Sequence, residues 1–113
     1  MKIVKDKIRI KELKEMADNS FGNFIKAVVD IENEIIAVDA ELHSDEKALL
    51  LENGSNQKNL WGINLYPELP GEDFIEFDSM INLRPSQENR TRGVDNPGNR
   101  EKIKVIINKL VAR

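Results

Sequence analysis

Two long stretches of the sequence carry apolar residues at the spacing of an α-helix. In Ile10 to Ala17 they recur every three or four positions, and lysine and glutamate fill the outer face. From Asn99 to Arg113, five apolar residues follow the i, i+3, i+4, i+7, i+8 pattern: Ile103, Ile106, Ile107, Leu110 and Val111. Asp95 or Asn96 is the expected cap of this second helix, with Pro97 near its first position.

A third, shorter helix is predicted between these two. Ser44 has the side chain of an N-cap, and Asp45 and Glu46 follow in the first turn, where the helix dipole favours acidic groups. An alanine and three leucines come next, and Gly54 is a typical residue to end a helix.

β-Branched residues and alternation predict the strands. Four main strands and one candidate N-terminal strand are expected, at Phe24 to Ile31, Ile35 to Leu42, Leu60 to Tyr66, Phe74 to Leu83 and Lys2 to Lys5. The order α-β-β-α-β-β-α contains two hairpins. We therefore expect an α+β fold, with a mostly antiparallel four-stranded sheet, three helices on one face of it, and one domain across residues 1–113.

The composition is that of a globular protein and limits the chemistry. Hydrophobic residues make up 40% of the chain and charged residues 33%. The absence of cysteine excludes disulfides, thiolate catalysis and cysteine-ligated zinc. No apolar run resembles a signal peptide or approaches the roughly 18 residues of a membrane span. We therefore expect a cytoplasmic protein with no membrane partner.

The densest hydrogen-bonding chemistry lies between Met80 and Gly93, where the predicted fourth strand runs into a loop. Guanidinium groups bind phosphate and carboxylate groups in a bidentate manner. We expect this loop to bind an anionic small molecule or a protein partner through Asn82, Arg84, Ser86, Gln87, Asn89, Arg90 and Arg92. The alternative that these residues anchor the long loop to the rest of the protein stays open.

A small hydrolytic or proton-transfer enzyme is the second candidate. His43 is the only histidine, so any histidine-based general acid or base is this residue. Glu41 would orient its imidazole, and Arg84 would neutralise the charge of the substrate, which requires His43 and Arg84 to open into one pocket. We expect no metal and no cofactor, because a zinc site normally needs more than one histidine or cysteine.

Nucleic acid and a second copy of the chain are further candidate partners. The loop arginines suit phosphate contacts, as do the cations of the last predicted helix: Arg100, Lys102, Lys104, Lys109 and Arg113. The net charge of −3 and the shortage of aromatic residues for base stacking disfavour nucleic acid. Edge strands in a small sheet can pair in a homodimer. Gly62, inside a strand, indicates a bulge or the close approach of another backbone.

Several strings together resemble a known family. They are F-I-K-A-V-V-D-I-E, L-W-G-I-N-L-Y-P and N-L-R-P-S-Q, with the closing helix. The chain is similar over residues 8 to 112 to a small prokaryotic family of uncharacterised single-domain proteins, catalogued as a domain of unknown function. The resemblance implies no activity.

Overall fold

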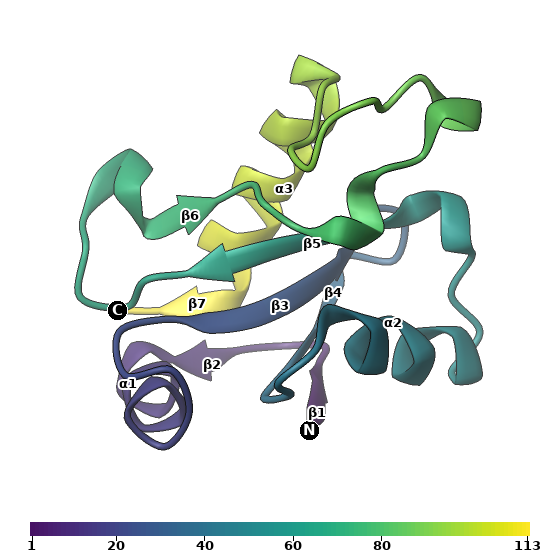
Figure 1. The fold of residues 1–113 in the computed structure, drawn as a ribbon. Helices are drawn as coiled ribbons and strands as arrows, with labels where there is room; N and C mark the ends of the chain where they lie inside the picture. The colour runs from purple at the N-terminus through teal and green to yellow at the C-terminus, as the bar shows by residue number, and fades with distance from the viewer.

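A five-stranded antiparallel sheet runs through the middle of the molecule (Figure 1). In the computed structural model, which describes residues 1–113, the strand order is β1 (Lys2–Val4), β4 (Ile35–Val38), β3 (Ile25–Asp30), β5 (Leu60–Leu65) and β6 (Ile75–Glu76). A separate parallel pair joins β2 (Ile8–Arg9) to β7 (Val111–Ala112). The helices are α1 (Ile10–Asp18), α2 (His43–Glu52) and α3 (Pro97–Leu110). The α+β class and the N-terminal strand are confirmed.

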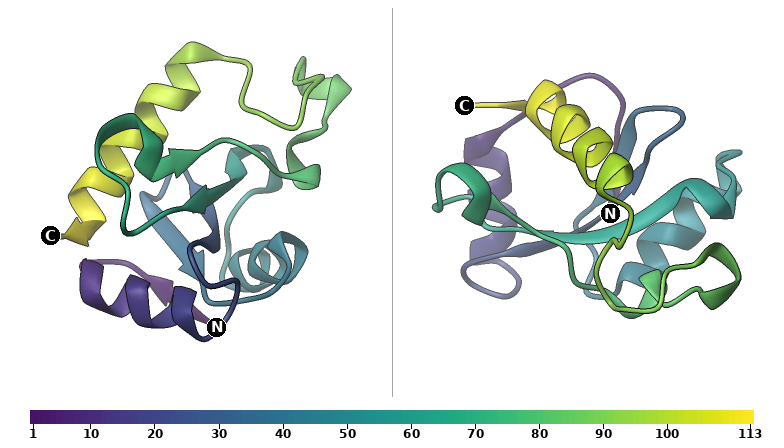
Figure 2. Two further views of the ribbon diagram at one scale, coloured as in Figure 1. Left: turned by 60° about the vertical axis from the view of Figure 1, so that its left-hand side comes forward. Right: turned by 90° about the horizontal axis from the view of Figure 1, so that it is seen from above.

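Helices cover both faces of the sheet, so the prediction that all three lie on one face is wrong (Figure 2). On one face α1 and α3 form the main core with alternate residues of β3 such as Ala27 and Val29. On the other, Leu50 of α2 packs against Val28. The reason is that β3 is apolar at consecutive positions, a pattern typical of strands buried on both faces. None of the helices is long and apolar enough to span a membrane.

The second helix starts earlier than predicted. Strand β4 ends at Val38, and Asp39 next to it has a left-handed φ of 70°. Leu42 is the N-cap of α2 and makes no side-chain capping bond, so the expectation that Ser44 caps this helix is wrong. His43 is consequently the first residue of a helix, and it does not extend a strand.

The C-terminal helix is close to the prediction but shorter. Asn96 is its N-cap, with its side chain accepting a hydrogen bond from the backbone N–H of Asn99. The helix ends at Leu110, because Val111 joins β7 and pairs with Ile8 in the parallel ladder. The apolar pattern therefore identifies the buried residues of α3 but not its last residue.

The fourth predicted strand, Phe74 to Leu83, is mostly wrong. Only Ile75 and Glu76 pair with β5, opposite Leu65 and Asn64. The chain then turns through two 3₁₀ helices, η3 (Met80–Asn82) and η4 (Pro85–Gln87). Next to Gly62, this edge of β5 is covered by the side chain of Asn82 in η3 and not by a strand. This arrangement determines the geometry of the candidate site.

Candidate functional site

Asn82 pairs with the main chain of β5 as a neighbouring strand would. Its carboxamide oxygen accepts a hydrogen bond from Gly62 N–H at 2.9 Å, and its Nδ2 donates to Gly62 O at 2.9 Å. Nδ2 also donates to Arg92 O at 2.9 Å. The side chain is fully buried. The side-chain amide of Asn82 thus takes the place of a paired strand. No local sequence pattern predicts this arrangement.

Gly62 allows η3 to cross β5 closely. A Cβ atom on Gly62 would lie 2.5 Å from Ser79 Cβ and 3.1 Å from Ile81 Cγ1. The sequence predicts a bulge or the close approach of another backbone at Gly62, and the structure places the side chains of Ser79 and Ile81 there.

Arg84 holds the loop against β5 and carries a buried positive charge. It donates to Gln57 O and to Leu60 O, both at 2.7 Å. Its guanidinium carbon lies 4.0 Å from the ring centroid of Trp61. Its Nε has no partner, and no acidic side chain contacts it. Burial lowers the pKa of Arg84, yet a guanidinium stays protonated in proteins. The charge is therefore stabilised by two carbonyl dipoles and the face of the Trp61 ring, with no acidic group.

Two further loop residues anchor the loop to itself and to the 3₁₀ helix η1 (Gln57–Asn59). Asn89 donates to the carbonyls of Asn82, Thr91 and Gly93 and accepts from the backbone N–H of Asp95. Gln87 donates to Lys58 O at 3.1 Å. These bonds give the loop one fixed shape and leave fewer of its side chains to bind a ligand.

The remaining loop residues predicted to bind a ligand are exposed. Ser86 and the side chain of Arg90 make no hydrogen bond. Arg92 donates from Nε to Asp78 at 2.6 Å. Arg84 stacks on Trp61 on the α3 side of β5, while Arg92 lies in a pocket on the α2 side. The structure does not bring the three arginines together at one point.

A pocket of about 440 Å³, here called the Trp61 pocket, opens between β5, the loop and the start of α3. The lining residues that matter for binding are Lys58, Asn59, Trp61, Gln87, Asn99 and Lys102. The indole N–H of Trp61 is buried and has no acceptor. Lys58 and Lys102 form no ion pair. Glu88 and Asp95 also line the pocket, and the Asp95 carboxylate already accepts from the backbone N–H of Arg90 and the hydroxyl of Thr91.

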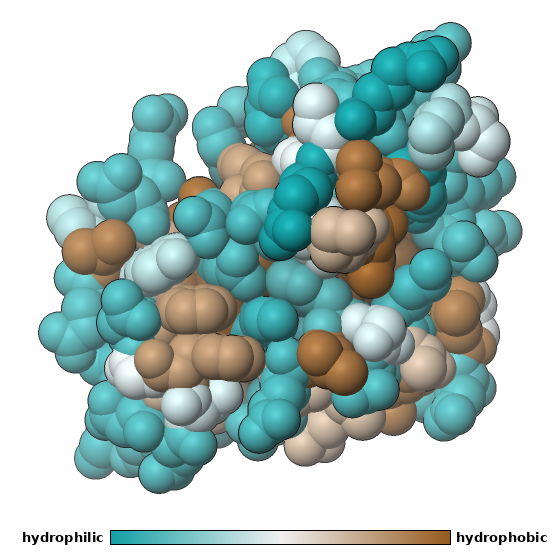
Figure 3. Space-filling model, in the orientation of Figure 1, coloured by the Kyte–Doolittle hydropathy of each residue, from teal (hydrophilic) through white to brown (hydrophobic).

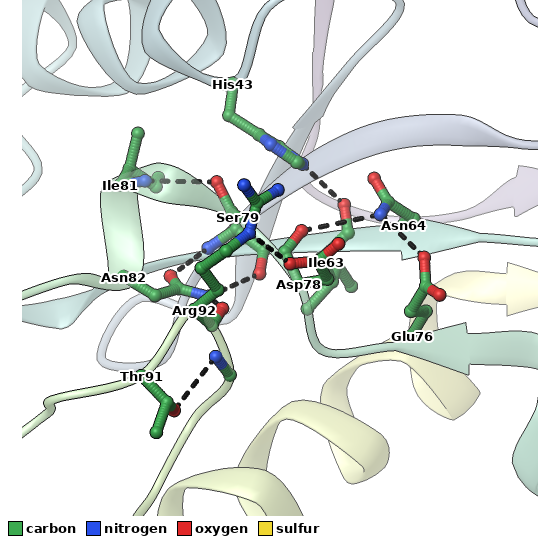
Figure 4. A network of polar contacts seen from close by, with 12 residues as sticks. His43, Ile63, Asn64, Glu76, Asp78, Ser79, Ile81, Asn82, Thr91 and Arg92 are labelled. Atoms are coloured by element: carbon green, nitrogen blue, oxygen red, sulfur yellow. Dashed lines mark hydrogen bonds and ion pairs between the residues drawn. The ribbon is translucent and has the colours of Figure 1, made fainter.

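A second pocket of about 410 Å³, the His43 pocket, lies on the α2 side of β5 (Figure 4). Its polar lining groups come from five segments and include Lys26, His43, Asn64, Glu76, Asp78 and Arg92. His43 Nε2 lies 2.7 Å from Ile63 O. A carbonyl only accepts, so Nε2 carries the proton and Nδ1 is free to accept. Burial lowers the pKa of His43, so the ring is neutral at pH 7.

The predicted catalytic grouping of His43 with Glu41 and Arg84 does not assemble. Glu41 lines a different hollow, with Met1 and Glu52, and Arg84 does not line the His43 pocket. No group of three or more histidine or acidic side chains is arranged to hold a metal ion. The side chains that do accompany His43 include Asn64, Asp78 and Arg92 (Figure 4).

Sequence reasoning missed Lys26 and Lys58, and it named Lys102 only as one of the cations of the last predicted helix that suit phosphate contacts. Lys26 interrupts the apolar strand β3, and this single cation within an apolar run is a signal that was available. Lys58 and Lys102 come from separate elements and meet at the Trp61 pocket only in the folded chain. No pattern in the sequence shows that Lys58 and Lys102 lie at the same pocket.

The comparison with known proteins agrees with the resemblance noted from the sequence. No curated protein and no solved structure matches the chain. Residues 2–110 match the family described as "Protein of unknown function (DUF5674)". This match covers nearly the whole chain, and the protein therefore belongs to that family.

Proposed function

We propose that this protein is a small anion-binding module and that its site is the Trp61 pocket. The observation that carries the proposal is the buried guanidinium of Arg84, which has no acidic partner and stacks on Trp61, whose own N–H has no acceptor. A buried unpaired cation and a buried unpaired donor each cost free energy. An anion bound in the adjacent pocket compensates the charge and accepts from the indole.

The edge of the pocket supports the same ligand chemistry. Lys58 and Lys102 supply two free ammonium groups. The N-terminus of α3, with Asn96 as its cap and Asn99 in its first turn, adds a positive helix dipole. The ligand class is therefore a small molecule that carries a phosphate or a carboxylate group.

The anchoring bonds of the loop also favour binding. Gln87 and Asn89 line the pocket and are held by carbonyls of η1 and of the loop itself. A site that is already ordered loses less conformational entropy when a ligand binds. A cytoplasmic location, compatible with a chain that has no cysteine, is part of the proposal.

Trp61 is the only tryptophan of the chain, so its fluorescence reports on this pocket directly. Inorganic phosphate and acetate, titrated at constant ionic strength, should each be tested for a saturable change in emission and a rise in Tm. We expect at least one of them to bind. In Lys58→Gln and in Lys102→Gln the Kd should rise at least about tenfold, as the loss of one charge-assisted hydrogen bond predicts.

Arg90→Gln is the matched control. Arg90 is an exposed cation of the loop beside the pocket, but its side chain does not line the pocket. This variant should bind like the wild type. A fluorescence change that does not saturate, or one that weakens equally in Arg90→Gln, would reject the Trp61 pocket as an anion site.

A further inference from the structure

The His43 pocket contains two hydrogen-bond acceptors that the protein leaves unused. Nδ1 of His43 makes no hydrogen bond, because Nε2 is the nitrogen that contacts Ile63 O. The carboxamide oxygen of Asn64 is buried and unpartnered, while its Nδ2 donates to Glu76 and to Asp78 O. In Figure 4 this oxygen points away from Glu76, to the side on which the imidazole lies. A ligand that satisfies both acceptors must donate hydrogen bonds.

The charges of the pocket favour a neutral ligand. Lys26 and Arg92 are balanced by Glu76 and Asp78, and His43 is neutral at pH 7. Arg92 is already paired with Asp78 at 2.6 Å. A net charge on the ligand would meet as many like charges as opposite ones. The remaining N–H groups of Arg92 and the ammonium of Lys26 still donate to neutral oxygen atoms.

Apolar surface borders the polar groups on two sides. Phe24 lines the pocket and belongs to a stack with Phe21 and Tyr66, at centroid distances of 4.7 and 5.3 Å. Leu42 and Met80 line another part and are 54% and 63% exposed. Figure 3 shows apolar groups on both sides of a hydrophilic zone on this face. An aromatic wall beside convergent polar groups is typical of small-molecule sites.

We propose that the His43 pocket binds a neutral molecule rich in hydroxyl groups, such as a sugar. Its hydroxyl groups donate to His43 Nδ1 and Asn64 Oδ1 and accept from Arg92 and Lys26, and its C–H face packs on Phe24. The two pockets have no lining residue in common. This site is therefore independent of the proposed anion site.

His43 is the only histidine, so the ¹⁵N signals of its ring report on this pocket without assignment. Ribose, glucose and galactose would be titrated at pH 7.5 into uniformly labelled protein. We expect a saturable shift of the Nδ1 signal with at least one sugar, while Nε2 remains protonated on Ile63 O. In Arg92→Gln the Kd should rise at least about tenfold, and in Arg90→Gln it should not change.

A second variant tests the carboxylate side of the pocket without removing any group in the core. Glu76→Gln should also weaken sugar binding, and Glu41→Gln, which lies in another hollow, should not. The proposal is overturned if none of the three sugars shifts the histidine signals. It is also overturned if glycine, a zwitterion of similar polarity, or inorganic phosphate shifts them when the sugars do not.

Discussion

Glu46→Gln should gain stability relative to the wild type as the pH rises. The difference between their free energies of unfolding should grow by about 1.4 kcal/mol for each pH unit between about pH 5 and pH 8. Glu46 lies on the buried side of α2 and is fully shielded from solvent. Burial raises its pKa from 4.5 to about 9, more than the hydrogen bond from Ala40 N–H lowers it.

The sign of this change in the free energy of unfolding follows from the proton that Glu46 retains in the folded protein. In this pH window folded Glu46 is protonated, whereas the unfolded chain releases the proton above its ordinary pKa of 4.5. The wild type therefore loses stability as the pH rises toward 9, and glutamine has no proton to lose. Predicting Glu46 as an ordinary first-turn acid misses this, because burial depends on what α2 packs against.

Urea unfolding at several pH values measures the effect. Asp45→Asn is the control, because it removes an acid from the same helical turn at a position that is exposed in both states. Its pH dependence should match that of the wild type. Parallel curves for Glu46→Gln and the wild type would show that folded Glu46 is ionised.

Gly62→Ala should destabilise the protein by at least about 3 kcal/mol. The new methyl group would lie 2.5 Å from Ser79 Cβ and 2.6 Å from Ser79 Oγ, so η3 must move away from β5. That movement also breaks the two hydrogen bonds between Asn82 and the main chain of Gly62. Chemical denaturation compares the two free energies of unfolding.

A double mutant that combines Gly62→Ala with Ser79→Gly tests whether the contact with Ser79 causes the loss of stability. Ser79→Gly removes both atoms closest to the new methyl group. The double mutant should therefore be more stable than the two single effects predict, by about 1 kcal/mol or more. Additive effects, or a Gly62→Ala protein within about 0.5 kcal/mol of the wild type, would contradict the close crossing of η3 over β5.

Sequence periodicity predicts those helices and strands whose apolar pattern lies within the element itself. The strands β3 and β5 and the helices α1 and α3 follow from local apolar patterns, with errors at their ends. The parallel pair of Ile8 with Val111 does not, since its two halves lie at opposite ends of the chain. The predicted fourth strand fails for a related reason, because the side chain of Asn82 occupies the edge of β5 at Gly62.

The candidate site shows the same limit. The sequence marks Met80 to Gly93 as a polar loop, but it does not tell an anchoring side chain from a free one. Arg84 and Asn82 are anchored because their partners lie on η1 and β5, twenty or more residues earlier in the chain. The lysines of the Trp61 pocket come from outside the loop, and only the folded structure places them beside it.

The most direct test of the proposed function is the single indole N–H signal of Trp61 in a ¹H–¹⁵N spectrum. If phosphate or acetate binds where Arg84 and Trp61 lack partners, this signal should move downfield. The shift should saturate with the same Kd as the fluorescence change. In Lys102→Gln, the affinity measured from this shift should be weaker. An indole signal that stays in place while the anion binds elsewhere on the protein would contradict the account.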